Sequence, residues 1–548
     1  MGADSTEIRF YGHASIYVST PTASLVTDPW FSSRGAFLSA WHQFPRNDHL
    51  DLEPLREVDY VVLSHEHRDH FDVDFLRTIS PRTKIIIPKY TDTYLRDELL
   101  ATVSNEVVVA ASHEKIQLSE DLALTPVVQS VPIWDDCTLM IETPRGTIAD
   151  VNDMKVSGRD LAWIRREFDI DYLFVQYSGA NWHPHVYDYD SERKREISRH
   201  KRRNKFAAVG KNFAASGARW LVPSAGPPCF LDPEHFELNF EEDSIFPTQL
   251  EFYRYAQREG FAERTIILLP GDLLEDKSDY GTDNERRLQA ACFTDKRAYL
   301  ERYQRDRLPL ISHELAAIPP APESLEDKLR AHFQPLVSSS AFFRRKIDGR
   351  VLVETTGPNP ERFVVDFTRN RDSVYRYAGE DCFYTLRIED RLLNLVLDGE
   401  LSWEELLLSL RVGASRTPDE YNEFLVVFLR FANPDSYRAY ARYERQKQLG
   451  ERAIVEDGGV RYEIQRYCPH AMADLTQGQI SDGCVVCPGH GWKFRLDTGE
   501  CTSNAATIAV RALPDLERER VGIGQESEHP EGAADGPIPA QETPNRTS

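Results

Sequence analysis

The stretch Ser64–His70, which reads Ser-His-Glu-His-Arg-Asp-His, constrains the fold more than any other part of the chain. It directly follows the apolar run Tyr60–Leu63. A short apolar run that ends in histidines and an aspartate is typical of a buried strand that carries metal ligands to a sheet edge. The alternative is a polar loop with solvated histidines. Four candidate ligands in six residues, placed directly after an apolar strand, favour the metal site.

These four ligands are the residues His65, His67, Asp69 and His70. Neutral imidazole nitrogen and carboxylate oxygen bind zinc and iron alike. We therefore predict that the four residues hold one or two metal ions. We also predict that Asp69 and His70 are catalytic.

Composition limits the classes of function that this chain can have. Its 548 residues suffice for two to four domains. A net charge of −23 disfavours nonspecific nucleic-acid binding, which depends on neutralising phosphates. No apolar run reaches the length of a membrane span, and the polar N-terminus does not resemble a signal peptide. Half of the eight cysteines cluster late in the chain, which indicates a cytoplasmic protein with one cysteine-dependent metal site.

Changes in pattern along the chain suggest five segments. Strand-like and helix-like runs mix up to about residue 275, which predicts a layered α/β domain with many strands. The pattern then weakens, and we expect a linker or extension over 276–349. Residues 350–445 are predicted to form a small α+β module that packs on or covers the substrate site. We expect a further domain over 446–524 and a disordered acidic tail over 525–548.

The N-terminal segment resembles the metallo-β-lactamase fold, an αββα sandwich with its metals at one edge. The resemblance rests on Gly12–Ser15, on Thr27–Trp30 and on the histidine cluster. It implies a second metal-binding aspartate after a later strand, for which we predict Asp153, with Asp150 as the alternative.

One histidine of that fold has no counterpart here. The fold usually supplies it shortly before the later strand, but Gln129–Asp136 contains none. We predict that His183 and His185 are metal ligands in its place. They could equally face a substrate or be exposed.

A second metal motif lies near the C-terminus. It pairs Cys-Pro-His with Cys-Pro-Gly-His across sixteen residues. Two thiolates and two imidazoles suit a Rieske [2Fe–2S] cluster, with the cysteines on one iron and the histidines on the other. The alternative is a Cys2His2 zinc site, but the prolines and the following Gly491-Trp492 match Rieske proteins. Cys484 lies outside the ligand spacing. The predicted ligands in this all-β domain are Cys468, His470, Cys487 and His490.

Residues 191–205 are a basic run inside an acidic protein. If helical, this run would align guanidinium and ammonium groups along one side, which suits a phosphate or an acidic redox partner. The alternative is a solvated helix face.

The two metal domains together resemble the CMP-N-acetylneuraminate hydroxylase family. Its named members, however, carry the Rieske domain at the N-terminus, and they have a histidine before their Asp-x-Cys stretch where this chain has Val131. The resemblance implies an iron monooxygenase that uses O2 to hydroxylate a small nucleotide-linked or amide-bearing sugar-like substrate. The chain contains no Gly-x-Gly-x-x-Gly fingerprint. We therefore expect electrons from an external NAD(P)H-dependent reductase, a ferredoxin or a cytochrome b5-like carrier. The alternatives are a zinc hydrolase with a redox domain and a pure electron carrier.

Overall fold

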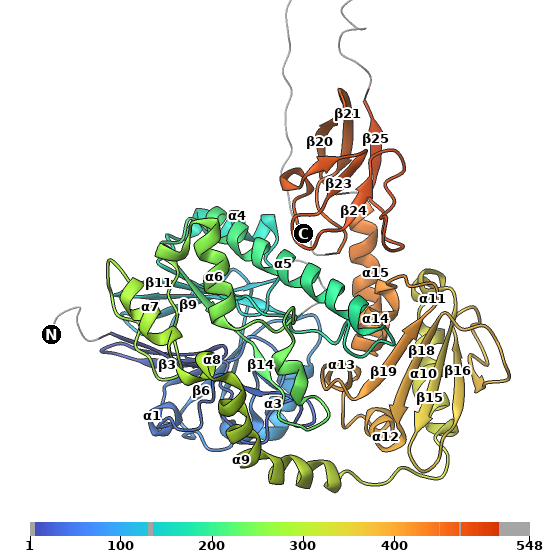
Figure 1. The fold of residues 1–548 in the computed structure, drawn as a ribbon, viewed down its shortest axis with the longest axis horizontal. Coiled ribbons are helices and arrows are strands. Elements are labelled where there is room, and N and C mark those ends of the chain that lie inside the picture. The colour runs from blue at the N-terminus through green and yellow to red at the C-terminus, as the bar shows by residue number, and fades with distance from the viewer. Residues whose placement is uncertain (1–5, 130–134, 449, 471–472, 514–548) are drawn as a thin grey trace, which may run out of the picture.

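The computed structural model describes residues 6–129, 135–448, 450–470 and 473–513. Its three units are a two-layered sandwich, a middle module and a small β-domain that the long helix α15 (Pro434–Gln448) connects to the middle module (Figure 1). Val131 and the expected acidic tail lie outside the described residues. None of the helices in the described part of the chain is long and apolar enough to cross a membrane.

The N-terminal unit is a sandwich of two six-stranded sheets. Alternate residues such as Ile8 and Phe10 point between the sheets, where they meet Leu139 and Phe174 in one buried cluster. The first sheet has the order β1 (Glu7–Gly12), β2 (Ser15–Ser19), β3 (Ser24–Thr27), β5 (Tyr60–Val62), β6 (Lys84–Pro88), β7 (Val107–Ala110). The second has the order β13 (Trp220–Ser224), β12 (Tyr172–Gln176), β11 (Gly146–Asp150), β10 (Cys137–Thr143), β9 (Ala123–Val128), β8 (Ile116–Gln117).

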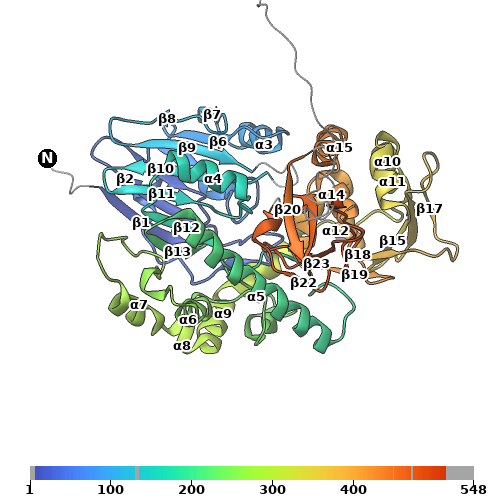
Figure 2. The same ribbon diagram turned by 90° about the horizontal axis from the view of Figure 1, so that it is seen from above.

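Helices cover both outer faces of this sandwich, as Figure 1 shows, and Figure 2 shows from above those that lie over the second sheet. The outer face of the first sheet packs against helices that contribute Leu55, Phe75 and Leu99. The second sheet packs against Ile164, Phe206 and Phe252 in the same way, which confirms the predicted αββα architecture. The covering helices are α1 (Glu53–Arg56), α2 (Val73–Leu76) and α3 (Tyr94–Thr102) on one side and α4 (Gly158–Glu167), α5 (Ser191–Ser216) and α6 (Gln249–Glu259) on the other.

The basic run 191–205 forms the first half of helix α5. The Asp190 side chain accepts a hydrogen bond from the backbone N–H of Arg193, and Gly217 ends the helix in a left-handed conformation at φ 73°. Helix α5 passes from the sandwich to the other two units, so one side of its N-terminal half faces them (Figure 1).

The middle module is a five-stranded sheet covered by helices. Its core is continuous with aromatic side chains of the sandwich unit, including Trp41 and Phe230. Trp41 also donates a hydrogen bond from Nε1 to the carbonyl of Leu408 at 2.8 Å. The sheet order is β17 (Val374–Arg376), β16 (Arg362–Asp366), β15 (Arg350–Thr356), β18 (Tyr384–Glu389), β19 (Val412–Arg416), and the helices include α12 (Asp390–Asp398), α13 (Trp403–Leu408) and α14 (Glu423–Phe431).

Residues 276–349, expected as a linker or extension, contain further helices. Leu300 and Tyr303 pack against Phe44 of the sandwich unit, whereas Leu329 and Phe333 belong to the core of the middle module. The sequence pattern is weak here because each helix buries only a few side chains. The helices are α7 (Gly281–Leu288), α8 (Ala291–Thr294), α9 (Lys296–Ala317), α10 (Glu326–Ser339) and α11 (Ala341–Ile347).

The C-terminal unit consists of two three-stranded antiparallel sheets around a small core, which agrees with the predicted all-β domain. The core includes Cys468 and Cys487 beside Phe494 and Leu496. Its strands are β20 (Arg452–Asp457), β21 (Val460–Gln465) and β25 (Val510–Ala512) in one sheet and β22 (Ile480–Ser481), β23 (Cys484–Val486) and β24 (Lys493–Arg495) in the other.

Candidate functional site

The histidine cluster begins where strand β5 ends. β5 pairs in parallel with β3 and β6, and its side chains are buried on both faces, with Val61 in one core and Val62 in the other. After this strand His65 and His70 are fully buried, so the chain delivers its ligands into the interior.

Two groups of candidate ligands meet at this point. In each, one donor atom per residue lies within 4.8 Å of the others, and the two groups are His65, His67 and Asp153, and His13, Asp69 and His70. A 3.5 Å approach of His70 Nε2 to Asp153 Oδ1 links them. The structure thus brings together five of the predicted metal-site residues and adds one more, His13.

His13 belongs to the Gly12–Ser15 motif, but the sequence alone did not identify it as a metal ligand. Its Nε2 lies 3.1 Å from Asp69 Oδ2. The residue has a left-handed backbone, at φ 53°, in the turn between β1 and β2. The position of His13 in a turn directly after an apolar strand is the feature of the sequence that could have identified it as a ligand.

Asp28, which follows strand β3, fixes the orientation of the cluster. Its Oδ2 accepts a hydrogen bond from His70 Nδ1 at 2.8 Å, and its Oδ1 accepts one from the Ser64 backbone at 2.7 Å. A histidine whose Nδ1 donates to a carboxylate presents Nε2 as the metal-binding atom. Here Nε2 faces Asp69 and Asp153.

The buried histidines and carboxylates of this cluster fit a metal site. Buried Asp69 Oδ1 and His13 Nδ1 have no hydrogen-bond partner within the described part of the chain, and such atoms in native proteins call for an explanation such as a bound ion. Burial and the neighbouring His70 also hold the pKa of His65 well below its ordinary value, which leaves a neutral imidazole. Imidazoles and carboxylates in this number suit iron or zinc without deciding between them.

Asp153 and Asp150 differ in their surroundings. For Asp153, burial favours the neutral acid, but His70 outweighs it and lowers the pKa below the ordinary value. For Asp150, burial and the nearby Asp28 raise the pKa well above that value. Asp153 therefore has the charge and the position of a ligand.

The middle module contributes a carboxylate to this cluster. Glu404 Oε2, on helix α13, lies 3.3 Å from His67 Nε2 and 2.6 Å from Arg430 Nε of helix α14. Glu66 completes the group, with Oε1 3.7 Å from Arg430 Nη2. Burial opposes the charge on Glu404, but Arg430 and His67 together lower its pKa to about 2. Sequence reasoning assigned no site residue to this module.

His183 and His185 lie elsewhere. Neither joins a group of three candidate ligands in the described part of the chain. The ring of His183 packs edge-on against Tyr187, and that of His185 stacks on Phe246. The ligand role predicted for them stays a prediction.

The second predicted site assembles in the C-terminal unit. The thiols of Cys468 and Cys487 lie 3.3 and 3.4 Å from His490 Nε2, and the rings of His470 and His490 have centroids 4.5 Å apart. Burial disfavours a thiolate at Cys487, but Cys468 and His490 outweigh it and hold its pKa well below the ordinary value. Thiolates beside imidazoles are the donor set of a Rieske cluster.

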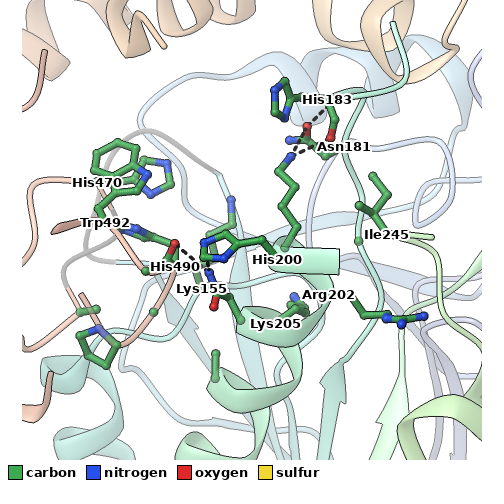
Figure 3. Close-up of a pocket in the computed structure, with 18 of the residues that line it drawn as sticks. Lys155, Asn181, His183, His200, Arg202, Lys205, Ile245, His470, His490 and Trp492 are labelled. Atoms are coloured by element: carbon green, nitrogen blue, oxygen red, sulfur yellow. Dashed lines mark hydrogen bonds between the residues drawn. The ribbon is translucent and has the colours of Figure 1, made fainter. Parts of the chain in front are cut away.

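A cavity of about 1550 Å3 lies where the three units meet. His470, His490 and Trp492 line one side, and Asn181 and His183 line another, with helix α5 between them (Figure 3). Helix α5 also contacts the C-terminal unit directly, because Asn204 Nδ2 donates to the carbonyl of His490 at 3.2 Å. The cavity reaches the chain around Asp153, since its walls include Asn152 and Lys155.

Comparison with protein families identifies all three units. Residues 24–159 match a beta-lactamase superfamily domain. Residues 325–444 match the Rv3818-like, SCP2-like domain, and residues 435–514 match the Rieske [2Fe–2S] domain, which supports the predicted cluster.

Two curated relatives align along nearly the whole chain. The Rieske 2Fe-2S iron-sulfur protein of Mycolicibacterium smegmatis is 31% identical over 525 residues, which covers 90% of this chain and 97% of the relative. Rv3818 of Mycobacterium tuberculosis is 31% identical over 518 residues with the same coverage.

Other matches are partial. Cholesterol 7-desaturase of Xenopus laevis is 44% identical over 58 residues, 10% of this chain and 13% of the relative. N-acyl-phosphatidylethanolamine-hydrolyzing phospholipase D 1 of Caenorhabditis elegans is 32% identical over 91 residues, 16% of this chain and 26% of the relative. Among solved structures, the diiron β-hydroxylase CmlA of Streptomyces venezuelae matches with TM-score 0.34 and 13% identity, covering 50% of this chain and 54% of that chain.

Proposed function

We propose that this chain, which belongs to the Rv3818-like family of Rieske iron–sulfur proteins, is an O2-dependent monooxygenase. The observation that carries the proposal is the shared cavity. His490 of the cluster site and the residues on both sides of Asp153 line the same space. A Rieske cluster supplies single electrons, and an iron held by histidines and carboxylates supplies open positions for O2.

The proposed reaction inserts one oxygen atom of O2 into a C–H bond of the substrate and reduces the other to water. It consumes two electrons and two protons. We propose that the electrons come from an external NAD(P)H-dependent reductase, a ferredoxin or a cytochrome b5-like carrier, and that the protein is cytoplasmic. The partial match to cholesterol 7-desaturase supports an oxidoreductase.

We further propose a small substrate that is nucleotide-linked or an amide-bearing sugar. The support is the resemblance of the two metal motifs to the CMP-N-acetylneuraminate hydroxylase family. In this proposal His65, His67, Asp69, His70 and Asp153 hold the iron, and Asp69 and His70 act in catalysis. Asp28 would orient His70, and Glu404 would orient His67.

A zinc-dependent hydrolase with a Rieske redox domain is the second candidate. The beta-lactamase superfamily match and the partial match to a phospholipase D favour it. The same His and carboxylate set would then hold zinc, which would supply Lewis-acid activation of water.

Metal analysis with electron paramagnetic resonance (EPR) distinguishes the two candidates. The oxygenase predicts iron beyond the two atoms of the cluster, a Rieske signal after dithionite reduction, and O2 uptake by the reduced protein. His67→Ala should abolish O2 uptake and keep the Rieske signal. As a control, replacing the exposed His49 by alanine should change neither the O2 uptake nor the Rieske signal. Stoichiometric zinc without O2 uptake would contradict the oxygenase.

A further inference from the structure

The wall of the central cavity that helix α5 provides is basic. Residues one turn apart on a helix share a face, and Ile197, Lys201 and Lys205 all line the cavity, as does His200. Figure 3 shows Lys205 and His200 on α5 between the cluster histidines and His183. The basic run in the sequence thus places part of its charge on the wall of the cavity, where Lys201 and Lys205 are partly buried.

The two lysines differ from the arginines around them in their partners. Arg202 pairs with Asp243 at 2.8 Å, and Arg416 pairs with Asp419 at 2.7 Å. Lys201 instead donates to neutral oxygens, the Asn181 side chain at 3.2 Å and the His183 carbonyl at 2.7 Å. Lys205 donates to the Gln176 side-chain oxygen. Within the described part of the chain, neither lysine forms an ion pair.

This arrangement is electrostatically unfavourable without a ligand. Like charges one turn apart on a helix repel. Burial is the main cause that lowers the pKa of Lys201 to about 7 and that of Lys205 to about 8. Lys155 adds repulsion at both lysines, and the more distant carboxylates of Asp153 and Asp136 offset only part of the lowering at Lys205. A positive charge that is partly withdrawn from water is stabilised by a partner of opposite charge.

An unsatisfied polar side chain on the same cavity is a second, independent observation. Ser178 is 1% exposed and lines the cavity, and its Oγ has no hydrogen-bond partner among the described residues. A hydroxyl can donate to an anionic oxygen.

We propose that Lys201 and Lys205 form a binding site for an oxyanion, the phosphate or carboxylate group of a small molecule that occupies the cavity. The site deepens the proposed function, on which it rests for the identification of that small molecule as the substrate. An ammonium group binds an anionic oxygen through a charge-assisted hydrogen bond. The two lysines would hold the charged end of the molecule, and the rest would extend toward the cluster histidines and the Asp153 chain segment.

Isothermal titration calorimetry of the metal-loaded full-length protein with inorganic phosphate, and separately with acetate, tests the site. We expect the double variant Lys201→Met/Lys205→Met to weaken binding at least tenfold, since each charge-assisted hydrogen bond contributes roughly a factor of ten or more. Arg203→Met removes an exposed charge of the same helix outside the cavity and should stay within twofold of wild type.

A charge-preserving variant guards against a folding artefact. Lys201→Arg/Lys205→Arg should keep binding within a few-fold, and the Rieske EPR signal should be the same in all variants. Tighter phosphate than acetate binding would assign the group to a phosphate ester, and the reverse to a carboxylate. Absence of binding to the wild type, equal binding to the Met double variant, or an equal loss in Arg203→Met would overturn the site.

The outcome is independent of the oxygenase proposal. Zinc in the metal centre together with lysine-dependent phosphate binding would refute the oxygenase and retain the anion site. O2 uptake by a protein that binds neither phosphate nor acetate would refute the anion site and retain the oxygenase.

Discussion

Replacing Glu404 by glutamine should destabilise the protein, because its carboxylate compensates a buried arginine of the same module. The Glu404 and Arg430 side chains are 8% and 7% exposed. Removing one partner of a buried ion pair costs about 3–5 kcal/mol. Glu66 lies 3.7 Å from Arg430 and keeps part of the compensation, so we expect about 3 kcal/mol. In a unit of about 100 residues, the size of the middle module, this lowers the melting temperature by roughly 12–24 °C.

Calorimetric melting of Glu404→Gln, Arg430→Met and the double variant measures this coupling. The double variant removes both charges and should recover most of the loss, since replacing an entire buried pair is often close to neutral. Glu400→Gln changes an exposed residue of the same module and should cost less than about 0.5 kcal/mol. The reasoning is wrong if Glu404→Gln has the same melting temperature as Glu400→Gln. It is also wrong if the loss of stability in the double variant equals the sum of the losses in the two single variants.

The same variant reports on the metal centre. Losing a residue that orients a metal ligand weakens metal binding by roughly 10–100-fold. We therefore expect Glu404→Gln to lose its non-cluster metal to a chelator more readily than Glu400→Gln, with an unchanged Rieske signal.

Three other perturbations have expected outcomes. Asp28→Asn weakens the hydrogen bond that orients His70 and should reduce affinity at the metal centre by about 10–100-fold in a chelator competition, and unchanged affinity would contradict the assigned orientation. Sulfate keeps its charge across pH 6–9, so its affinity in calorimetry should fall as pH rises above 7–8, where Lys201 and Lys205 lose their protons; a flat profile would count against lysine recognition. Asp190→Ala removes the N-cap of helix α5 and should cost about 1 kcal/mol in denaturant unfolding, whereas no measurable loss would show that the cap is dispensable.

The sequence was most informative where ligands follow a regular element closely. The apolar run around Val61 and Val62 indicates a strand that is buried on both faces, as in a parallel sheet. The residues that directly follow such a strand lie at the edge where the strands of the sheet end. His65 and His70 therefore had to lie near one another. The cluster motif likewise rests on local spacing, and the Rieske domain match supports it.

Sequence reasoning failed where function depends on contacts between distant segments. Glu404 occupies the first turn of a short helix, where acidic residues are common for helix-dipole reasons. No local pattern marks it as a neighbour of His67. The same holds for Lys201 and Lys205, whose interior position depends on how the three units pack around α5.

The carboxylate from the middle module has a consequence for synthesis. The neighbouring contact between Arg68 and Glu405 spans 337 residues. At about 5–20 residues per second, a ribosome needs roughly 20–70 s to make that stretch. During this interval the nascent histidine cluster lacks Glu404. A metal ion captured co-translationally would therefore bind while His67 still lacks the carboxylate that orients it in the finished protein.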